Sequence, residues 1–278
     1  PPLRKPRAAG GRGPDSSVRT DDPMPALPAG FLDRPIAHRG LHDRAAGVIE
    51  NSLPAIRAAA AAGYGCEIDL QIASDGEAMC FHDDDLDRLT GATGPVRARP
   101  AAELTALALT GAAPQARIPN FAQALEAAGE APLLVEIKRQ ADTVGVGPLE
   151  SRAAGLIAAH AARGGGPVAV MSFDPRAIAW FHANAPQIPR GLVSMDWDRD
   201  ADGRGLTAEQ RADLTGMRMF EASGCGFCSF HWKDLPTPRT RALRETGLPV
   251  LCWTTRSPAD DAAARPHVDN VTFEGYRP

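Results

Sequence analysis

The chain has no long apolar segment, no paired cysteine pattern and no large excess of charge of one sign. A run of about 18 apolar residues that could span a bilayer is absent, and so is a secretion signal with a basic start and a small-residue cleavage site. The 5 cysteines are odd in number and scattered, which suits a reducing compartment, so we expect a cytoplasmic protein. A net charge of −4 argues against a basic nucleic-acid binder.

The composition is that of a globular protein, with 44% hydrophobic and 23% charged residues in a chain of 278. This length permits two domains of average size or a single α/β barrel. Residues 1–23 contain Pro, Gly, Ser and basic residues with almost nothing apolar, so we expect a disordered N-terminal extension there and a single domain over residues 24–278. A nucleic-acid arm or a targeting peptide is disfavoured because interleaved aromatic residues and an amphipathic period are missing.

The fold class follows from an alternation that begins at residue 35. Short apolar runs alternate with alanine-rich segments of helical length, which is typical of a parallel α/β fold. A capping side chain stands just before a proline at four expected helix starts, at Ser52, Asp174, Thr237 and Ser257. Nine strand candidates are one more than an eight-stranded barrel needs, and we suspect Gly191–Ser194 and Asn270–Phe273 of being the extra one.

Acidic residues stand inside two of the apolar strand candidates. Glu67 and Asp69 are two residues apart, so on a strand both carboxylates project from one face. The apolar run 132–137 also contains Glu136, and Lys138 follows on the same face. A buried, unpaired carboxylate would be strongly unfavourable or protonated. We therefore expect Glu67, Asp69 and Glu136 to converge on one hard divalent cation, Mg²⁺ or Ca²⁺.

Two histidines lie at the ends of strand candidates. His38 and Arg39 end the first, and a hairpin over residues 71–82 has arms of similar length, which returns His82 to the edge that holds Asp69. Histidines beside a metal triad suit general acid–base catalysis, and Arg39 and Lys138 supply positive charge for a phosphate. These residue types point to phosphoryl chemistry, although metal-dependent isomerases and amidohydrolases use similar ones.

Several other residues have both a functional and a purely structural interpretation. Glu50 either assists the site or caps the following helix, and Trp253 either lines the substrate site or packs in the barrel; we assign both to substrate binding. The acidic run 83–85 is more typical of a solvated loop than of further metal ligands. Cys225 and Cys228 lack the second ligand pair that a zinc site needs, so we expect buried thiols.

Five motifs occur in the order HRG (38–40), ENS (50–52), EID (67–69), FHD (81–83, followed by LDRLT at 86–90) and EIK (136–138). Together they resemble the glycerophosphodiester phosphodiesterase family, in its bacterial cytoplasmic form, over about residues 35–276. The resemblance implies a TIM-type (β/α)8 barrel that hydrolyses glycerophosphodiesters to sn-glycerol 3-phosphate and an alcohol. It also implies roles for the matching residues: a divalent cation on Glu67, Asp69 and Glu136, acid/base catalysis by His38 and His82, and phosphate contacts from Arg39 and Lys138.

Some features depart from that family or leave its details open. The family usually closes with Thr-Asp before an aromatic residue and a proline, whereas residues 272–276 read TFEGY, which leaves the register of the last strand open. Either water or the 2-hydroxyl of the glycerol could attack first, and the family resemblance favours the hydroxyl, through a cyclic phosphate.

Two other functions were weighed against this one. A lipid-directed phospholipase C or D is disfavoured because residues 24–278 carry 25 basic and 31 acidic residues and few aromatic ones. A catalytically inactive phosphodiester-binding barrel is disfavoured because the catalytic set is complete. We therefore expect a small-molecule substrate, with no nucleic-acid partner and no stable membrane insertion.

Overall fold

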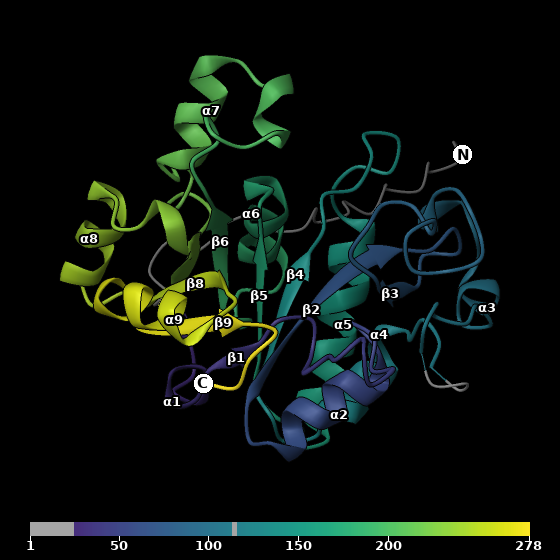
Figure 1. The fold of residues 1–278 in the computed structure, drawn as a ribbon. Coiled ribbons are helices and arrows are strands. Elements are labelled where there is room, and N and C mark those ends of the chain that lie inside the picture. The colour runs from purple at the N-terminus through teal and green to yellow at the C-terminus, as the bar shows by residue number, and fades with distance from the viewer. Residues whose placement is uncertain (1–24, 113–115) are drawn as a thin grey trace, which may run out of the picture.

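Within residues 25–112 and 116–278, which the computed structural model describes, eight parallel strands close into a barrel surrounded by helices (Figure 1). The first barrel strand pairs with both the second and the last, which closes the ring. The barrel strands are β1 (Ile36–Ala37), β2 (Gly65–Ile72), β4 (Leu133–Ile137), β5 (Val168–Ser172), β6 (Arg190–Ser194), β7 (Phe227–His231), β8 (Val250–Thr255) and β9 (Asn270–Phe273). The predicted TIM-type barrel is confirmed, while the extension expected over residues 1–23 lies outside the described residues.

The extra strand is β3 (Ala78–Cys80), which pairs antiparallel with β2. Our suspicion of residues 191–194 and 270–273 was wrong, because they belong to the barrel strands β6 and β9. Strand β2 continues past the barrel rim, and the chain then turns back along it until the Phe81 amide donates to the Asp69 carbonyl at 3.1 Å. The predicted hairpin therefore returns His82 to the mouth of the barrel.

The helices lie on the outside of the barrel, and the predicted caps are confirmed. Ser52, Asp174, Thr237 and Ser257 each accept a hydrogen bond from a backbone N–H in the first turn of the following helix. No helix within the described ranges is long and apolar enough to cross a membrane. The helices are α1 (Gly30–Asp33), α2 (Leu53–Ala61), α3 (Ala101–Leu104), α4 (Phe121–Ala128), α5 (Pro148–Ala162), α6 (Pro175–Asn184), α7 (Ala208–Thr215), α8 (Pro238–Glu245) and α9 (Pro258–Ala264), with single 3-10 turns at Val96–Ala98, Asp202–Gly205, Trp232–Asp234 and Arg265–His267.

Side-chain alternation along the strands separates two apolar layers. Along β4, Leu133, Val135 and Ile137 pack against the helices, while Leu134 joins the cluster inside the barrel. Phe31 of α1 is also fully buried in this inner cluster. Since side chains alternate with a period of two, Glu136 shares the inward face with Leu134. The fold thus turns an acidic side chain of an otherwise apolar strand toward the barrel axis.

One connection rises above the mouth of the barrel. Residues 195–226, between β6 and β7, include α7, which stands clear of the strand ends in Figure 1. None of the described α7 side chains is buried. This segment, which we call the α7 lobe, therefore adds a wall to the mouth, and its residues Met217, Phe220 and Cys225 pack into the main apolar cluster.

Candidate active site

The site begins at a tight turn after β1. Arg39 has φ 53° and Gly40 has φ 81°, both in the left-handed region. A Cβ on Gly40 would come within 2.7 Å of the Ala55 backbone in α2, so only glycine fits between the turn and this helix. The turn aims the Arg39 amide at Glu67, where it donates to Oε2 at 2.9 Å. The HRG motif thus fixes Arg39 against the first carboxylate of the site.

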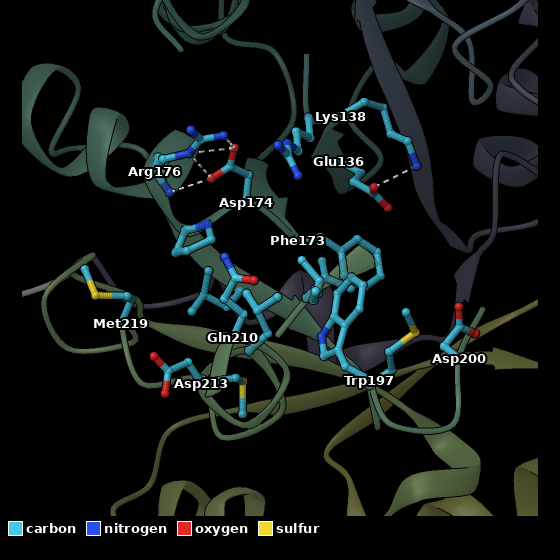
Figure 2. Close-up of a pocket in the computed structure, with 18 of the residues that line it drawn as sticks. Glu136, Lys138, Phe173, Asp174, Arg176, Trp197, Asp200, Gln210, Asp213 and Met219 are labelled. Atoms are coloured by element: carbon cyan, nitrogen blue, oxygen red, sulfur yellow. Dashed lines mark hydrogen bonds and ion pairs between the residues drawn. The ribbon is translucent and has the colours of Figure 1, made fainter. Parts of the chain in front are cut away.

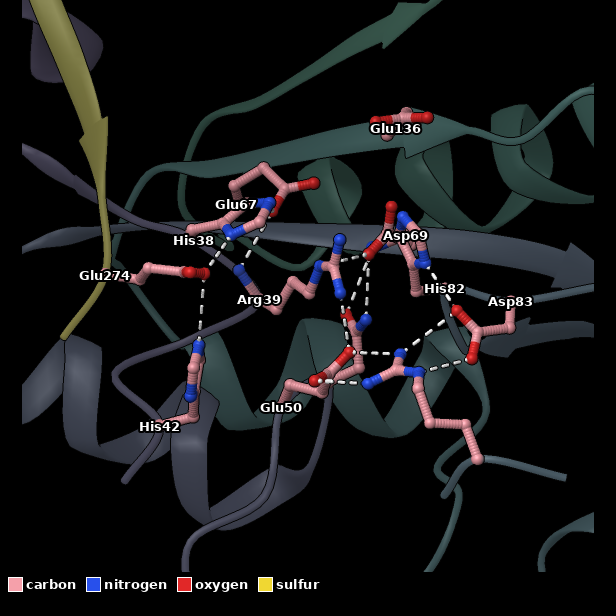
Figure 3. A network of polar contacts seen from close by, with 12 residues as sticks. His38, Arg39, His42, Glu50, Glu67, Asp69, His82, Asp83, Glu136 and Glu274 are labelled. Carbon is pink, nitrogen blue, oxygen red and sulfur yellow. Dashed lines mark hydrogen bonds and ion pairs between the residues drawn. The ribbon is translucent and has the colours of Figure 1, made fainter. Parts of the chain in front are cut away.

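The three predicted metal ligands converge. Asp69 and Glu136 are direct partners in the β2–β4 register, and ligand oxygens of Glu67, Asp69 and Glu136 lie within 4.8 Å of one another (Figure 3). Glu67 and Asp69 are each only 1% exposed. Among the described residues, this trio is the one group of His, Cys, Asp and Glu side chains with the spacing of a metal site.

Asn51 holds the second carboxylate in place. Its Nδ2 donates to Asp69 Oδ2 at 2.9 Å, and its Oδ1 accepts from the Asp69 amide at 3.1 Å. Asn51 has φ 54°, a conformation that Asn tolerates better than most residues. The ENS motif had pointed to this segment, but the sequence reasoning did not single out Asn51.

Two cations face the triad. Lys138 Nζ lies 2.9 Å from Glu136 and 3.5 Å from Asp69, and Arg39 Nε lies 3.5 Å from Asp69. Burial alone would raise the pKa of Asp69, but Lys138, His82 and Arg39 hold it below its usual range. Burial, with Asp69 and Glu136 nearby, instead raises the pKa of Glu67 well above its usual value. The grouped carboxylates therefore favour the binding of a further cation at this site.

The predicted residue Glu50 links Arg39 to His82 through a chain of ion pairs (Figure 3). Its carboxylate accepts from Arg39 Nη1 at 2.7 Å and from both terminal nitrogens of Arg88, at 3.0 and 2.8 Å. Arg88 also donates from Nε to Asp83 at 2.6 Å, and Asp83 contacts His82 Nδ1 at 2.7 Å. Asp83, which we had expected in a solvated loop, therefore orients a predicted catalytic histidine.

His38 has a carboxylate partner that the sequence reasoning missed. Its Nδ1 lies 2.6 Å from Glu274 Oε2, directly after β9. Arg256 Nε also donates to Glu274 at 2.5 Å, and His42 Nε2 lies 3.6 Å from it. The TFEGY segment, noted only as a departure from the family pattern, was the signal for this residue.

Both histidines thus have the same arrangement, in which a carboxylate binds Nδ1 and an arginine braces that carboxylate. A neutral imidazole that donates from Nδ1 keeps a lone pair on Nε2 for proton transfer. Burial lowers the pKa of His38, and its hydrogen bond to Glu274 opposes that shift. The contact with Glu274 therefore keeps the pKa of His38 from falling as far as burial alone would lower it.

The charges at the site fit a divalent cation. Among the described residues, this network has six carboxyl groups and four permanent cations, so the acidic groups outnumber the cations by two. The carboxylates are Glu50, Glu67, Asp69, Asp83, Glu136 and Glu274, and the cations are Arg39, Arg88, Lys138 and Arg256. Oxygen ligands on a buried, acidic site match the preferences of Mg²⁺ and Ca²⁺.

A cavity of about 850 Å³ adjoins the triad, with Glu136 and Lys138 at one end of it (Figure 2), and His82 also lines it. Trp253 of β8 lies on its wall, where its ring centroid is 5.4 Å from that of Phe173. Trp253 therefore borders this cavity, and its role in substrate binding stays a prediction. Cys225 and Cys228 are buried free thiols in the described part of the chain.

A closed parallel barrel with acidic and basic side chains grouped at the carboxyl ends of its strands defines an enzyme of the TIM-barrel type. The model of the glycerophosphoryl diester phosphodiesterase family matches residues 38–271, and the chain belongs to this family. The predicted family and the predicted class of phosphoric diester hydrolase are confirmed. No curated protein sequence matches the chain.

Solved structures share the fold at low sequence identity. A phosphodiesterase from Oleispira antarctica, in complex with the product sn-glycerol-3-phosphate, is 23% identical with a TM-score of 0.71, over 88% of this chain and 93% of that one. A glycerophosphodiester phosphodiesterase from Thermotoga maritima is 21% identical with a TM-score of 0.61, over 86% and 94% of the two chains. One from Parabacteroides distasonis is 19% identical with a TM-score of 0.64, over 86% and 91%.

Proposed function

We propose that this enzyme hydrolyses glycerophosphodiesters to sn-glycerol 3-phosphate and an alcohol, in a reaction that depends on a divalent cation. The observation that carries the proposal is the pair of carboxylate-oriented histidines beside the Glu67, Asp69 and Glu136 triad. The product in the Oleispira antarctica structure supports the choice of substrate class.

The chain's own cations receive the phosphate. Lys138 and Arg39 lie beside the triad, and Arg39 Nε has no hydrogen-bond partner among the described residues. Glu50 holds Nη1 of the Arg39 guanidinium, and Nε faces Asp69 at 3.5 Å, so this cation stands beside the triad that the phosphate would approach. Glu67, Asp69 and Glu136 would hold Mg²⁺ or Ca²⁺, which neutralises negative charge on the phosphodiester when bound.

His38 and His82 carry the protons. One Nε2 removes the proton of the attacking oxygen as the new phosphorus–oxygen bond forms, and the other histidine protonates the alcohol oxygen as its bond to phosphorus breaks. The same proton balance holds for attack by water or by the glycerol 2-hydroxyl; in the second case water then opens the cyclic phosphate with the histidine roles reversed. Trp253 also lines the space proposed for the substrate.

The proposed setting is the cytoplasm, with a small diester as substrate and without a nucleic-acid partner. The support is chemical: the five cysteines are free and buried in the described part of the chain, as a reducing compartment allows.

The test is release of glycerol 3-phosphate from glycerophosphocholine and glycerophosphoethanolamine by purified protein with Mg²⁺ or Ca²⁺. We expect release from both substrates, and its loss in the His82→Ala variant at unchanged thermal stability. Full activity of that variant would contradict the histidine assignment, and absence of release from folded wild-type protein with either metal would contradict the proposed reaction.

A further inference from the structure

The cavity beside the triad has two chemically different halves. At one end Glu136 and Lys138 present charged atoms, and His82 also lines the cavity, as described above. Away from the triad, the walls from β6 and the α7 lobe bring together many apolar side chains and a few polar ones, such as Gln210 and Asp213 (Figure 2). The apolar limb is lined by Leu192, Val193, Met195, Leu206, Leu214, Met217 and Met219.

The outer wall of this limb is unusual for a surface lobe. Met219 is 45% exposed and is the one exposed large hydrophobic side chain among the described residues. Met195, Met217 and Met219 are three of the chain's 6 methionines, and the first two are buried, at 7% and 2% exposure. Methionine is flexible and polarizable, so a methionine-rich wall adapts to apolar ligands of varied shape.

The three arginines that line the same cavity each have a carboxylate partner, and for Arg139 it is Asp142 at 3.5 Å. Arg176 binds Asp174 at 2.7 Å on the α6 side, and Arg218 binds Asp213 at 2.9 Å in the α7 lobe. These arginines are therefore occupied and do not offer a free cation to an anionic headgroup. The limb instead offers apolar surface, which gains free energy only when it covers an apolar ligand.

The size of the cavity also exceeds what a small headgroup fills. Its 850 Å³ lies near the upper end of the range of about 300–1,000 Å³ for sites that enclose drug-sized ligands. The proposed catalytic groups and the cations that would receive the glycerophosphate belong to the polar end. The apolar limb opens directly from this end, so a substituent on the diester would reach it without leaving the cavity.

We propose that the apolar limb binds a hydrocarbon chain carried by the glycerophosphodiester, so that the preferred substrate is a monomeric amphiphile. This inference rests on the function proposed above and leaves the reaction unchanged: water is added across the phosphorus–oxygen bond to the alcohol. A chain on the glycerol yields an acylated glycerol 3-phosphate, whereas a chain on the alcohol yields glycerol 3-phosphate and a long-chain alcohol.

Three substrates test the proposal: glycerophosphocholine, 1-decanoyl-glycerophosphocholine, and the octyl ester of glycerol 3-phosphate, each below its micelle concentration. Each fully buried methylene favours binding about fourfold, so a partly buried chain raises kcat/KM at least about tenfold over glycerophosphocholine. The decanoyl and octyl arms distinguish a chain on the glycerol from a chain on the alcohol.

Two matched variants locate the effect. Met219→Glu places a charge on the limb. We compare kcat/KM for the preferred chain-bearing substrate with kcat/KM for glycerophosphocholine, and we expect this ratio to fall about tenfold in the variant. Ala212→Glu places the same charge on an exposed α7 residue that does not line the cavity, and leaves this ratio unchanged. The comparison separates the effect of a contact with the substrate's hydrocarbon chain from the effect of a changed charge on the α7 lobe.

The results discriminate between the two proposals. Hydrolysis of glycerophosphocholine at least as efficiently as both chain-bearing diesters would overturn the apolar-limb inference and leave the proposed function standing. The apolar-limb inference would also be overturned if Met219→Glu and Ala212→Glu showed the same ratio of kcat/KM for the chain-bearing substrate to kcat/KM for glycerophosphocholine. No turnover of any of the three diesters by folded, metal-supplied protein would overturn the proposed function and this inference with it.

Discussion

Replacing Glu274 by Gln tests the positioning of His38 most sharply. The substitution keeps the size of the side chain and an amide oxygen that can accept from His38 Nδ1, but it removes the negative charge 2.6 Å from the ring. Both side chains are largely shielded from water, at 12% and 19% exposure, so the charge acts on the ring with little screening.

The size of the effect follows from when His38 is charged. In the resting enzyme His38 is neutral, because burial lowers its pKa, and it becomes an imidazolium only when it holds a proton during turnover. A hydrogen bond to a charged partner contributes about 1.5–3 kcal/mol, and roughly 1.4 kcal/mol corresponds to a factor of ten. We therefore expect kcat to fall about 10- to 100-fold with KM changed less than about threefold.

The pH profile reports which role His38 has. The contact with Glu274 raises the pKa of His38, so its removal lowers that pKa further. The limb of the profile that belongs to His38 then moves to lower pH: the acidic limb moves if His38 is the base, and the alkaline limb moves if it is the acid.

Steady-state kinetics of glycerol 3-phosphate release provide the assay, with two controls. Glu274→Asp keeps the charge and should recover part of the loss. Arg256→Gln removes only the 60% exposed arginine that braces Glu274, and should change kcat less than about threefold. A Glu274→Gln enzyme with kcat within twofold of the wild type and an unmoved pH profile would refute the reasoning.

Three further predictions concern the rest of the network. Alanine at His38 or His82 should reduce kcat at least about 100-fold while metal affinity, measured by calorimetry, stays near the wild-type value. Asn51→Ala removes both hydrogen bonds to Asp69 and should weaken metal binding about 10- to 100-fold in the same assay; an unchanged affinity would exclude the positioning role. For Glu50, burial is outweighed by Arg88 and Arg39, which lower its pKa from 4.5 to about 2 in the folded protein. Its contribution to stability is therefore present above about pH 4.5 and is lost as the pH falls toward 2, so urea unfolding should show the gap between wild type and Glu50→Gln narrowing over that interval.

The barrel and the triad were predictable because both follow from local patterns. The spacing of Glu67 and Asp69 puts both on one face of a strand whatever the tertiary structure, and Glu136 is conspicuous in an otherwise apolar run. The parallel α/β alternation then brings both strands to the same edge. These arguments need only periodicity and the cost of burying charge.

The remaining parts of the site depend on contacts that no local pattern encodes. Glu274 meets His38 across 236 residues because β9 closes the ring against β1, with Ala37 opposite Phe273. Asp83 has an ordinary acidic-loop sequence, and only the position of Arg88 shows its role. The choice of β3 as the extra strand likewise depended on strand pairing, since its residues are as apolar as those of the barrel strands.

The central claim is that the carboxylate triad and the two histidines act together on a glycerophosphodiester. The most direct measurement is glycerol 3-phosphate release from glycerophosphocholine by EDTA-treated protein, before and after Mg²⁺ or Ca²⁺ is restored, in the wild type and in Glu136→Gln. The account predicts that EDTA abolishes release, that one of the two ions restores it in the wild type, and that the variant needs a much higher ion concentration. Undiminished release after complete removal of metal would contradict it.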